Sequence, residues 1–411
     1  GQKCSAASLV VLVGQAQRSR RFREQLLDAV RSLTVGYPWD AASQMGPIIT
    51  PASGKLLDGL TKLGAGERWV GEPRKMDDSG KLWSPGVRAG VQRGSEFHLV
   101  EYFGPILGIM TADTLEEAID IVNEVDYGLT SGIHSLDRGE VSQWLDTIQA
   151  GNLYVNRGIT GAIVQRQPFG GWKKSVVGCT TKAGGPNYLV GLGAWERSTA
   201  AVVAPIAHQG AQSILDAANA VAKAHSAALT REDAAMLERA LGSDAQAWAE
   251  EFGRDRDVQS LYAERNVFRY LTFPGEIAVR LSEQAPVVDL LRVVAAGLVA
   301  GARLRVSTGV ELSSSAKAAL AGAGVPMRTE TDAEFLGAAA SLRSGRMRLI
   351  GGDSVALARA INGRVDLAVY SGEVTESGRV EMLPFLREQA VSITAHRFGT
   401  PNGLTEGLLS R

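Results

Sequence analysis

The chain has 411 residues, of which 45% are hydrophobic and 21% charged, and its formal net charge is −1. This length suffices for two or three domains, each with its own hydrophobic core. The balance of acidic and basic residues gives no indication of a nucleic-acid partner, and no apolar run reaches the length of a membrane span. The chain has only two cysteines, which are far apart, so the sequence predicts no disulfide framework and a reducing, cytoplasmic setting.

The first part of the chain alternates between short apolar runs and amphipathic stretches, which predict strands and helices respectively. One helix has a recognisable start, because Thr114 and Glu117 have the spacing of a capping box. In chain order, we expect a strand over 9–13, helices over 16–33 and 51–63, a strand–turn–strand over 97–110, helices over 114–125 and 140–148, and a strand over 151–156.

The second part begins with an Ala-rich stretch, 200–257, that predicts a helical connector. Regular alternation of strands and helices follows, which favours a parallel sheet covered on both faces. Pro274-Gly275 lies between two apolar runs and predicts a hairpin of 267–273 with 277–281. Beyond it we expect helices over 287–300, 313–323, 333–342 and 355–361, and strands over 304–307, 327–329, 347–350 and 365–370.

The first cysteine, Cys4, stands between Lys3 and Ser5 just before the first apolar run. A thiol with small, polar neighbours at the mouth of a strand is a candidate nucleophile, because a thiolate needs access and an environment that stabilises its charge. The alternative is a cysteine that packs as a small hydrophobe, which is the more common role of a free thiol. These neighbours alone favour packing, and the rest of the chain reverses that preference.

Four stretches of the first part resemble the aldehyde dehydrogenase superfamily in their order and separation. Each motif alone has moderate specificity, whereas the ordered set is hard to explain by chance. The four are Gly1-Gln2-Lys3-Cys4-Ser5, Glu101-Tyr102-Phe103-Gly104-Pro105-Ile106, Gly151-Asn152-Leu153-Tyr154-Val155-Asn156-Arg157 and Gln167-Pro168-Phe169-Gly170-Gly171.

A narrower resemblance is carried by the stretches 160–164 and 181–189, which are similar to the L-glutamate γ-semialdehyde (1-pyrroline-5-carboxylate) dehydrogenase branch. The second half, up to 387–393, resembles the C-terminal extension of long proline utilization A proteins, and 169–174 is similar to their actinobacterial versions. Those proteins are bifunctional. The resemblance therefore implies NAD as the cofactor of this part and FAD in a proline dehydrogenase domain expected upstream, outside this chain.

The resemblance implies an α/β fold in four parts. They are an aldehyde dehydrogenase catalytic region over 1–199, the helical connector over 200–257, a degenerate Rossmann-like module over 258–382, and a C-terminal lid motif with a loose tail over 383–411. The chain lacks an initiator Met, and a strand is expected almost at once, so we expect a fragment whose N-terminal part is missing. The expected partners are that missing part, further copies of the protein in a homo-oligomer, and a small-molecule substrate.

For the reaction, the resemblance implies that Cys4 is the nucleophile, forming a thiohemiacetal and then a thioester. Sulfur suits this role because it is nucleophilic once partly ionised. Glu101 would accept hydrogen bonds from the ribose hydroxyls of NAD, and Phe103 would pack near the nicotinamide. The general base and an oxyanion-binding Asn are expected upstream, so we expect the chain alone to be inactive.

For the substrate, the resemblance implies an anchor for the α-carboxylate and a cover for the aliphatic part. A carboxylate calls for a hydroxyl or for free backbone N–H groups in a turn. Ser5 and the backbone of Gly161 and Ala162 would supply these groups, and Phe169 would cover the aliphatic part. Phe169 could equally be a core aromatic, and the two roles are compatible.

The preferred function is therefore NAD-dependent oxidation of L-glutamate γ-semialdehyde to L-glutamate in proline catabolism. The alternatives are a non-catalytic assembly module that seals a substrate channel, and an aldehyde dehydrogenase with another substrate. Cys179 is interpreted as structural, and the histidines show no metal-ligand spacing. Gly351-Gly352-Asp353 follows a strand and precedes a helix, so it could cradle a phosphate or could be a tight turn.

Overall fold

The structure is a computed structural model that describes residues 1–196, 204–224 and 229–410. By its internal contacts the chain divides into two compact units. Unit 1 comprises 1–161, 171–173 and 393–408, and unit 2 comprises 162–170, 174–392 and 409–411. The four-part division expected from the sequence stays a prediction.

Unit 1 contains a sheet of four strands, which carries the first predicted strand at one edge. The strand order is β1 (Leu9–Val13), β4 (Ile106–Ala112), β3 (Gly86–Ala89) and β2 (Arg68–Gly71). β1 and β3 run parallel to β4, and β2 runs antiparallel to β3. The helices of this unit are α1 (Arg20–Arg31), α2 (Gly54–Thr61), α3 (Glu96–Leu99), α4 (Leu115–Asn123) and α5 (Arg138–Thr147).

The remaining strands of unit 1 include β6 (Thr130–Ile133), which pairs in parallel with β7 (Asn152–Val155). The short strands β5 (Tyr127–Gly128) and β8 (Trp172–Lys173) pair antiparallel. All four residues of β7 are buried, which agrees with the apolar run predicted there. One half of the capping box predicted for α4 is confirmed, since the Thr114 hydroxyl accepts a hydrogen bond from the N–H of Glu117. The Glu117 carboxylate accepts from the N–H of Asp113 instead of that of Thr114, so the other half is wrong.

Two predicted elements of unit 1 differ from the structure near the start of a helix. The strand expected at the beginning of 97–110 is the short helix α3, because the Ser95 hydroxyl caps it and Phe97 is buried in stacking contact with Tyr102. The helix expected over 16–33 is interrupted. A 3-10 turn covers 14–18, and the Ser19 hydroxyl then caps α1 by accepting from the N–H of Phe22.

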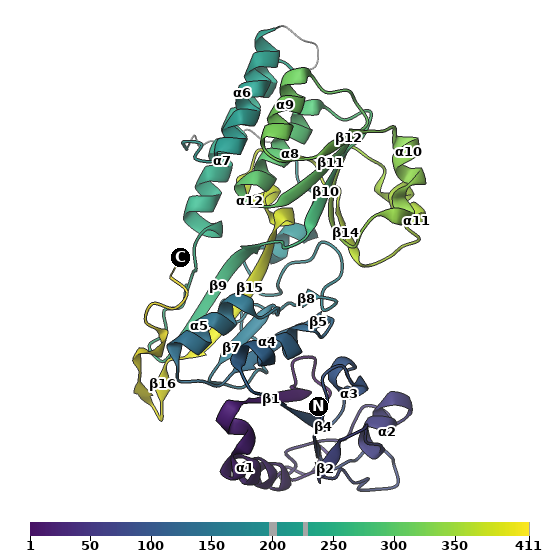
Figure 1. Ribbon diagram of the computed structural model, residues 1–411, viewed down its shortest axis with the longest axis vertical. Helices are drawn as coiled ribbons and strands as arrows, with labels where there is room; N and C mark the ends of the chain where they lie inside the picture. The colour runs from purple at the N-terminus through teal and green to yellow at the C-terminus, as the bar shows by residue number, and fades with distance from the viewer. Residues whose placement is uncertain (197–203, 225–228, 411) are drawn as a thin grey trace. The chain divides into compact units, whose positions relative to one another are not determined.

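Unit 2 contains a five-stranded, fully parallel sheet, which confirms the predicted α/β class and parallel pairing (Figure 1). The strand order is β12 (Met327–Thr329), β11 (Arg303–Thr308), β10 (Glu276–Leu281), β13 (Gly345–Ile350) and β14 (Leu367–Tyr370). The order reverses between β10 and β13, as it does in doubly wound folds, so the module is Rossmann-like.

Helices cover this sheet on both faces (Figure 1). On one side lie α8 (Val287–Val299) and α9 (Ser314–Gly322), with α6 (Gln209–Lys223) and α7 (Arg231–Ala247) packed against them where the helical connector was expected. On the other side lie α10 (Asp332–Gly337) and α11 (Ser354–Ala360). α12 (Gly378–Glu381) contacts α7 and α8. α8 is almost entirely buried, as expected of a mostly apolar helix, and its buried residues include the charged Asp289 and Arg292.

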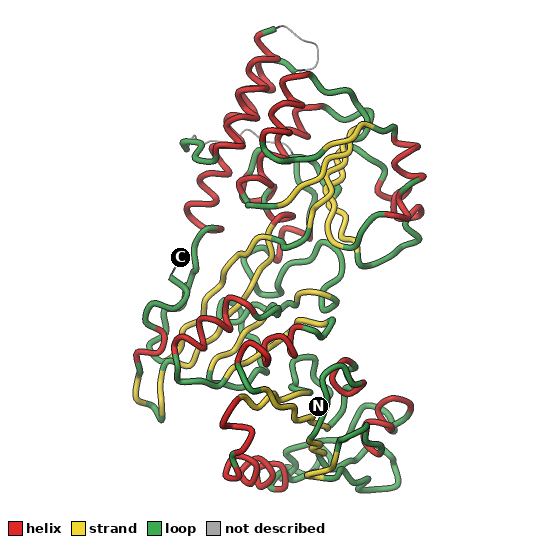
Figure 2. Tube along the Cα trace, in the orientation of Figure 1, coloured by secondary structure: helices red, strands yellow, loops and turns green. Residues whose placement is uncertain are grey.

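The hairpin predicted around Pro274-Gly275 is wrong. β9 (Glu264–Thr272) lies beside β15 (Leu386–Thr394) in a separate sheet, whereas β10 is the central strand of the parallel sheet (Figure 2). The N–H of Phe273 continues the first pairing by donating to the carbonyl of Phe385. Pro274-Gly275 is thus a crossing between sheets, because β10 buries both of its faces only between two parallel neighbours.

The tail expected to be loose is partly ordered within unit 1. Strands β16 (His396–Arg397) and β17 (Thr400–Pro401) pair antiparallel, and a 3-10 turn follows. Leu404 and Leu408 are buried and fix this segment. The lid role expected of the stretch before it stays a prediction. No helix among the described residues is long and apolar enough to cross a membrane.

Candidate active site

Cys4 lies on an exposed turn at the start of unit 1. The turn is closed by a hydrogen bond of 2.9 Å from the N–H of Ala6 to the carbonyl of Lys3. Just before it, the side-chain oxygen of Gln2 accepts from the N–H of Ile49 at 2.8 Å. Ser5, the next residue, is 1% exposed. The thiol of Cys4 is therefore accessible on a fixed turn, whereas the Ser5 hydroxyl is enclosed in protein.

The beginning of the chain lies directly against the second motif. A side-chain carbon added to Gly1 would come within 1.8 Å of the carbonyl oxygen of Gly104, so the two backbones are in close contact. This contact brings the cysteine turn and the stretch 101–105 together, although they are separated by most of unit 1 in sequence. The expectation that these motifs share a site is consistent with this geometry.

Glu101 and Phe103 flank a buried anchor, Tyr102. The Tyr102 ring is 8% exposed and stacks on Phe97 with ring centroids 4.9 Å apart, so it fixes the segment to the core. The Lys55 ammonium donates to the backbone carbonyl of Glu101 at 2.6 Å. The Glu101 carboxylate is exposed and has no hydrogen-bond partner within the part of the chain that the structure describes. It is free to accept hydrogen bonds from two vicinal hydroxyls, as a ribose would offer.

Phe103 adopts a left-handed backbone conformation, with a φ of 54°. This conformation is uncommon for a residue with a side chain, and it often marks a functional position. The ring is half-buried. Glu101 and Phe103 thus provide an acceptor and an apolar surface on one short segment, which fits the ribose and nicotinamide of a dinucleotide.

Gly161 is exposed and has a φ of 107°, a conformation that L side chains rarely adopt. Its carbonyl accepts a hydrogen bond of 2.8 Å from the hydroxyl of Tyr154 on β7. Burial raises the pKa of Tyr154, so the phenol stays protonated and remains a donor at neutral pH. The first residue of the predicted anchor turn is therefore held by the core of unit 1.

Ala162 and Phe169 belong to unit 2. Ala162 is exposed and Phe169 is half-buried. The backbone of Phe169 pairs with that of Ala183 through two hydrogen bonds of 2.9 Å. Nearby, the Gln167 amide is buried and donates to the side chains of Asn266 at 2.9 Å and Ser392 at 3.1 Å.

The predicted site residues are thus divided between the two units. Unit 1 holds Cys4, Ser5, Glu101, Phe103 and Gly161, and unit 2 holds Ala162 and Phe169.

Residues that hold the predicted site segments in place were not predicted from the sequence, notably Tyr154, Gln167 and Lys182. For Tyr154 a signal existed, because a tyrosine within a buried strand needs a partner for its hydroxyl. For Gln167 and Lys182 none existed, since their partners lie as far as 225 and 206 residues away.

The second cysteine, Cys179, has a hydrogen-bonded thiol with a raised pKa. The Cys179 thiol donates a hydrogen bond to the carbonyl of Val369 at 3.1 Å, and burial of the sulfur raises its pKa to about 11, although part of the residue is exposed. A thiol with so high a pKa is a poor nucleophile at neutral pH. This environment supports a structural role for Cys179.

The turn at Gly351-Gly352-Asp353 caps a helix. The Asp353 carboxylate accepts hydrogen bonds of 2.9 Å from the N–H groups of Val355 and Ala356 at the start of α11. The groups that a phosphate would need are already taken, so the tight-turn interpretation is supported over the phosphate cradle. Within the described ranges, no group of three or more His, Cys, Asp or Glu side chains is placed to hold a metal ion.

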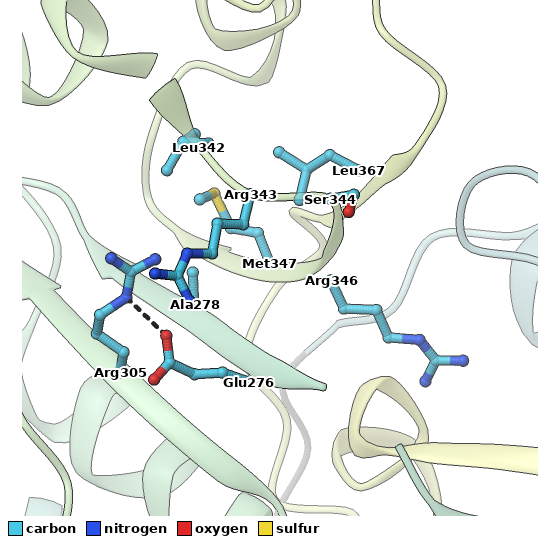
Figure 3. A pocket seen from close by; sticks show the side chains of 9 residues that line it. All are labelled: Glu276, Ala278, Arg305, Leu342, Arg343, Ser344, Arg346, Met347 and Leu367. Carbon is cyan, nitrogen blue, oxygen red and sulfur yellow. Dashed lines mark ion pairs between the residues drawn. The ribbon is translucent and has the colours of Figure 1, made fainter. Parts of the chain in front are cut away.

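A pocket in unit 2 lies at the amino-terminal ends of the parallel strands (Figure 3). Glu276 and Arg305 form an ion pair of 3.1 Å within it, and the Arg343 side chain extends toward them. None of the predicted site residues lines this pocket. In doubly wound sheets ligands bind outside the carboxyl ends of the strands, so this pocket is at the opposite edge from a dinucleotide site.

Comparisons with known proteins find similarity to one family in the first part of the chain. Residues 1–190 match the model described as the aldehyde dehydrogenase family. A 1-pyrroline-5-carboxylate dehydrogenase of Bacillus subtilis is 36% identical over 191 residues, which cover 46% of this chain and 36% of that protein. The corresponding protein of Staphylococcus haemolyticus is 36% identical over 194 residues, with the same coverage. The chain thus spans about a third of the length of these curated relatives.

The similarity to one solved structure extends much further along the chain. Proline utilization A from Corynebacterium freiburgense is 41% identical with a TM-score of 0.75, and the match covers 97% of this chain and 36% of that protein. The second half of the chain, which lies outside the family model, is therefore similar in sequence and fold to part of that protein.

Proposed function

We propose, from the match of residues 1–190 to the aldehyde dehydrogenase family model, that the protein oxidises L-glutamate γ-semialdehyde to L-glutamate with NAD. The observation that carries the proposal is the exposed Cys4, three residues after Gly1, whose backbone lies against Gly104 in the stretch that presents Glu101 and Phe103. The names of the Bacillus and Corynebacterium proteins support the choice of substrate, because the semialdehyde forms when 1-pyrroline-5-carboxylate is hydrolysed. A flavin-dependent proline dehydrogenase would supply this compound.

In the proposed mechanism the Cys4 thiolate attacks the aldehyde carbon and forms a thiohemiacetal. The backbone N–H of Cys4 donates to the oxyanion that develops on the former aldehyde oxygen. Bound NAD supplies the acceptor for the hydride, and the product is a thioester on Cys4. Hydrolysis of this thioester releases the γ-carboxylate and returns the free thiol.

The remaining residues hold the two molecules. Glu101 accepts from the ribose hydroxyls and Phe103 packs near the nicotinamide. The N–H groups of Gly161 and Ala162 bind the α-carboxylate, and Ala162 loses nothing relative to Ser at this point if only its N–H is used. The Ser5 hydroxyl is enclosed in protein, so it is not assigned to this anchor. Phe169 covers the aliphatic carbons and excludes water.

The test is NADH formation by the intact protein supplied with 1-pyrroline-5-carboxylate, followed by its absorbance. Cys4→Ser should reduce turnover to the background, and Cys179→Ser should retain wild-type turnover. Turnover by Cys4→Ser at the wild-type rate would refute the proposed mechanism and favour an assembly role for the chain. A non-carboxylated aldehyde of the same length measures the contribution of the carboxylate anchor. Equal kcat/KM for the two substrates would contradict the assignment of the semialdehyde.

A further inference from the structure

A buried lysine and a half-buried glutamate, Lys182 and Glu388, are in contact in unit 2, near the backbone of Phe169. Lys182 is 3% exposed, and its backbone N–H donates to the Oε2 atom of Glu388 at 2.6 Å. Its ammonium donates to the carbonyl of Gly170. Glu388 lies on β15, beyond the region that matches the aldehyde dehydrogenase family.

These contacts fix the backbone at Phe169 and at the residue that follows it. Ala183, which follows Lys182, exchanges two backbone hydrogen bonds of 2.9 Å with Phe169. Gly170, which follows Phe169, has its carbonyl bound by the Lys182 ammonium. A side-chain carbon on Gly170 would lie 3.3 Å from the Cα of Lys182, so the backbones of these two segments are in close contact. The position of the Phe169 backbone therefore depends on Lys182, and Lys182 depends on Glu388.

Glu388 is in turn fixed by a network of polar side chains. Its Oε1 atom accepts from the Asn187 amide at 2.5 Å, and the same amide group donates to the Tyr270 hydroxyl at 2.8 Å. Tyr270 donates to Glu251 at 2.8 Å, and Glu251 forms an ion pair of 2.5 Å with Arg379. A network in which each member is bound at both ends is rigid, and loss of one member disturbs its neighbours.

The charged state of Lys182 depends on the negative charge of Glu388. Burial lowers the pKa of Lys182 to about 7, and the negative charge of Glu388 opposes that shift. Burial also raises the pKa of Glu388, whereas Asn187 and Lys182 lower it. A buried ammonium that loses its carboxylate is strongly disfavoured, so it would lose its proton or move. Either change alters the bond to Gly170.

We propose that Lys182 and Glu388 are positioning residues that fix the backbone of Phe169, the residue proposed to cover the aliphatic carbons of the aldehyde, with Glu388 acting through Lys182. The inference rests on the proposed function for the identity of the aldehyde, and neither residue is assigned contact with the substrate. It predicts that a side chain from outside the family region determines the affinity for the substrate through the backbone of Phe169.

The kinetic test uses Glu388→Gln and Lys182→Met in the intact protein. Each should raise KM for the semialdehyde by about tenfold or more, with a smaller effect on kcat and none on KM for NAD, because a small displacement of a positioning group costs this much. The double variant should resemble the single variants, since both break one chain of contacts. The matched control is the exposed pair of Lys317 and Glu311 in the same unit, where Glu311→Gln and Lys317→Met should leave all constants unchanged.

A second readout does not depend on activity. A fluorinated phenylalanine placed at 169 should give one sharp fluorine resonance, which shifts or broadens in Glu388→Gln but not in Glu311→Gln. If Glu388→Gln does not fold, Asn187→Ala, which removes a donor to Glu388, should produce the same change. Unchanged KM together with an unchanged resonance would overturn the inference. If the wild-type protein fails to oxidise the semialdehyde, the proposed function falls, and the resonance alone decides whether Glu388 positions Phe169.

Discussion

The hydroxyl of Tyr154 donates a hydrogen bond to the carbonyl oxygen of Gly161 at 2.8 Å. Tyr154 is 1% exposed on β7, whereas Gly161 is exposed at the start of the predicted anchor turn. One bond therefore connects a buried strand to an exposed turn.

Tyr154→Phe should weaken substrate binding without unfolding the protein. The change removes one hydrogen bond, worth about 1 kcal/mol, and leaves an exposed carbonyl that water can reach. We expect KM for the semialdehyde to rise about fivefold and kcat to change less. Tyr37→Phe is the control, because the Tyr37 hydroxyl also donates to a neighbour, Asp77, at 2.6 Å but contacts no predicted site residue. An equal rise in KM for both variants would contradict a specific role for Tyr154.

Gly161→Ala should impair the carboxylate anchor through the backbone alone. The φ of 107° is strained for any residue with a side chain, at a cost of about 1–3 kcal/mol. The turn should relax to another conformation and withdraw its N–H, so KM should rise about tenfold or more. Gly158→Ala is the matched control, because Gly158 lies in the same loop, has open space around it and lacks a left-handed φ. KM values for Gly161→Ala within twofold of the wild type would argue against the anchor.

The two cysteines should differ in their reaction with iodoacetamide. Cys4 is exposed on its turn, while burial raises the pKa of Cys179 to about 11. At pH 8 only about one Cys179 thiol in a thousand is ionised, so labelling should occur at Cys4. Labelling of Cys179 should accelerate as the pH rises toward 11, because the thiolate fraction grows through that range. Peptide mass spectrometry measures both rates, and fast labelling of Cys179 at pH 8 would be inconsistent with its environment.

Arg292→Met should destabilise unit 2 far more than the loss of an exposed ion pair. The Arg292 guanidinium binds Asp244 at 2.7 and 2.8 Å and the carbonyl of Thr375 at 2.9 Å, and both charged side chains are 0% exposed. The substitution leaves the Asp244 carboxylate buried without its cation, at a cost of about 3–5 kcal/mol. Denaturant unfolding measures this cost.

The control for that measurement is Arg20→Met, which breaks an exposed pair with Glu24 on α1 and should cost no more than about 0.5 kcal/mol. Adding Asp244→Leu to Arg292→Met should restore part of the stability, since no unpaired charge then remains. A similar loss in the free energy of unfolding for Arg292→Met and Arg20→Met would show that the buried pair stabilises the protein no more than the exposed pair.

The sequence predicted most helices and strands correctly where local signals and burial agree. The runs around β7, α8 and β11 are mostly apolar at the positions that the structure buries, although polar residues such as Asn152 and Asp289 are buried there too. The errors occur where a neighbour distant in sequence decides the outcome. Pro274-Gly275 has the composition of a hairpin turn, yet β10 pairs with β11 and β13 instead of β9.

By itself, then, the sequence determined the α/β class, the ordered motifs and the choice of Cys4 over Cys179, because these depend on residue type and on spacing along the chain. Only the tertiary structure decided which side chains support the motifs. Tyr154 beneath Gly161 and Glu388 behind Lys182 are set by which elements pack together, and no local pattern encodes a contact across 206 residues. The reason is physical. A buried donor or charge must find its partner wherever the folded chain brings one within reach.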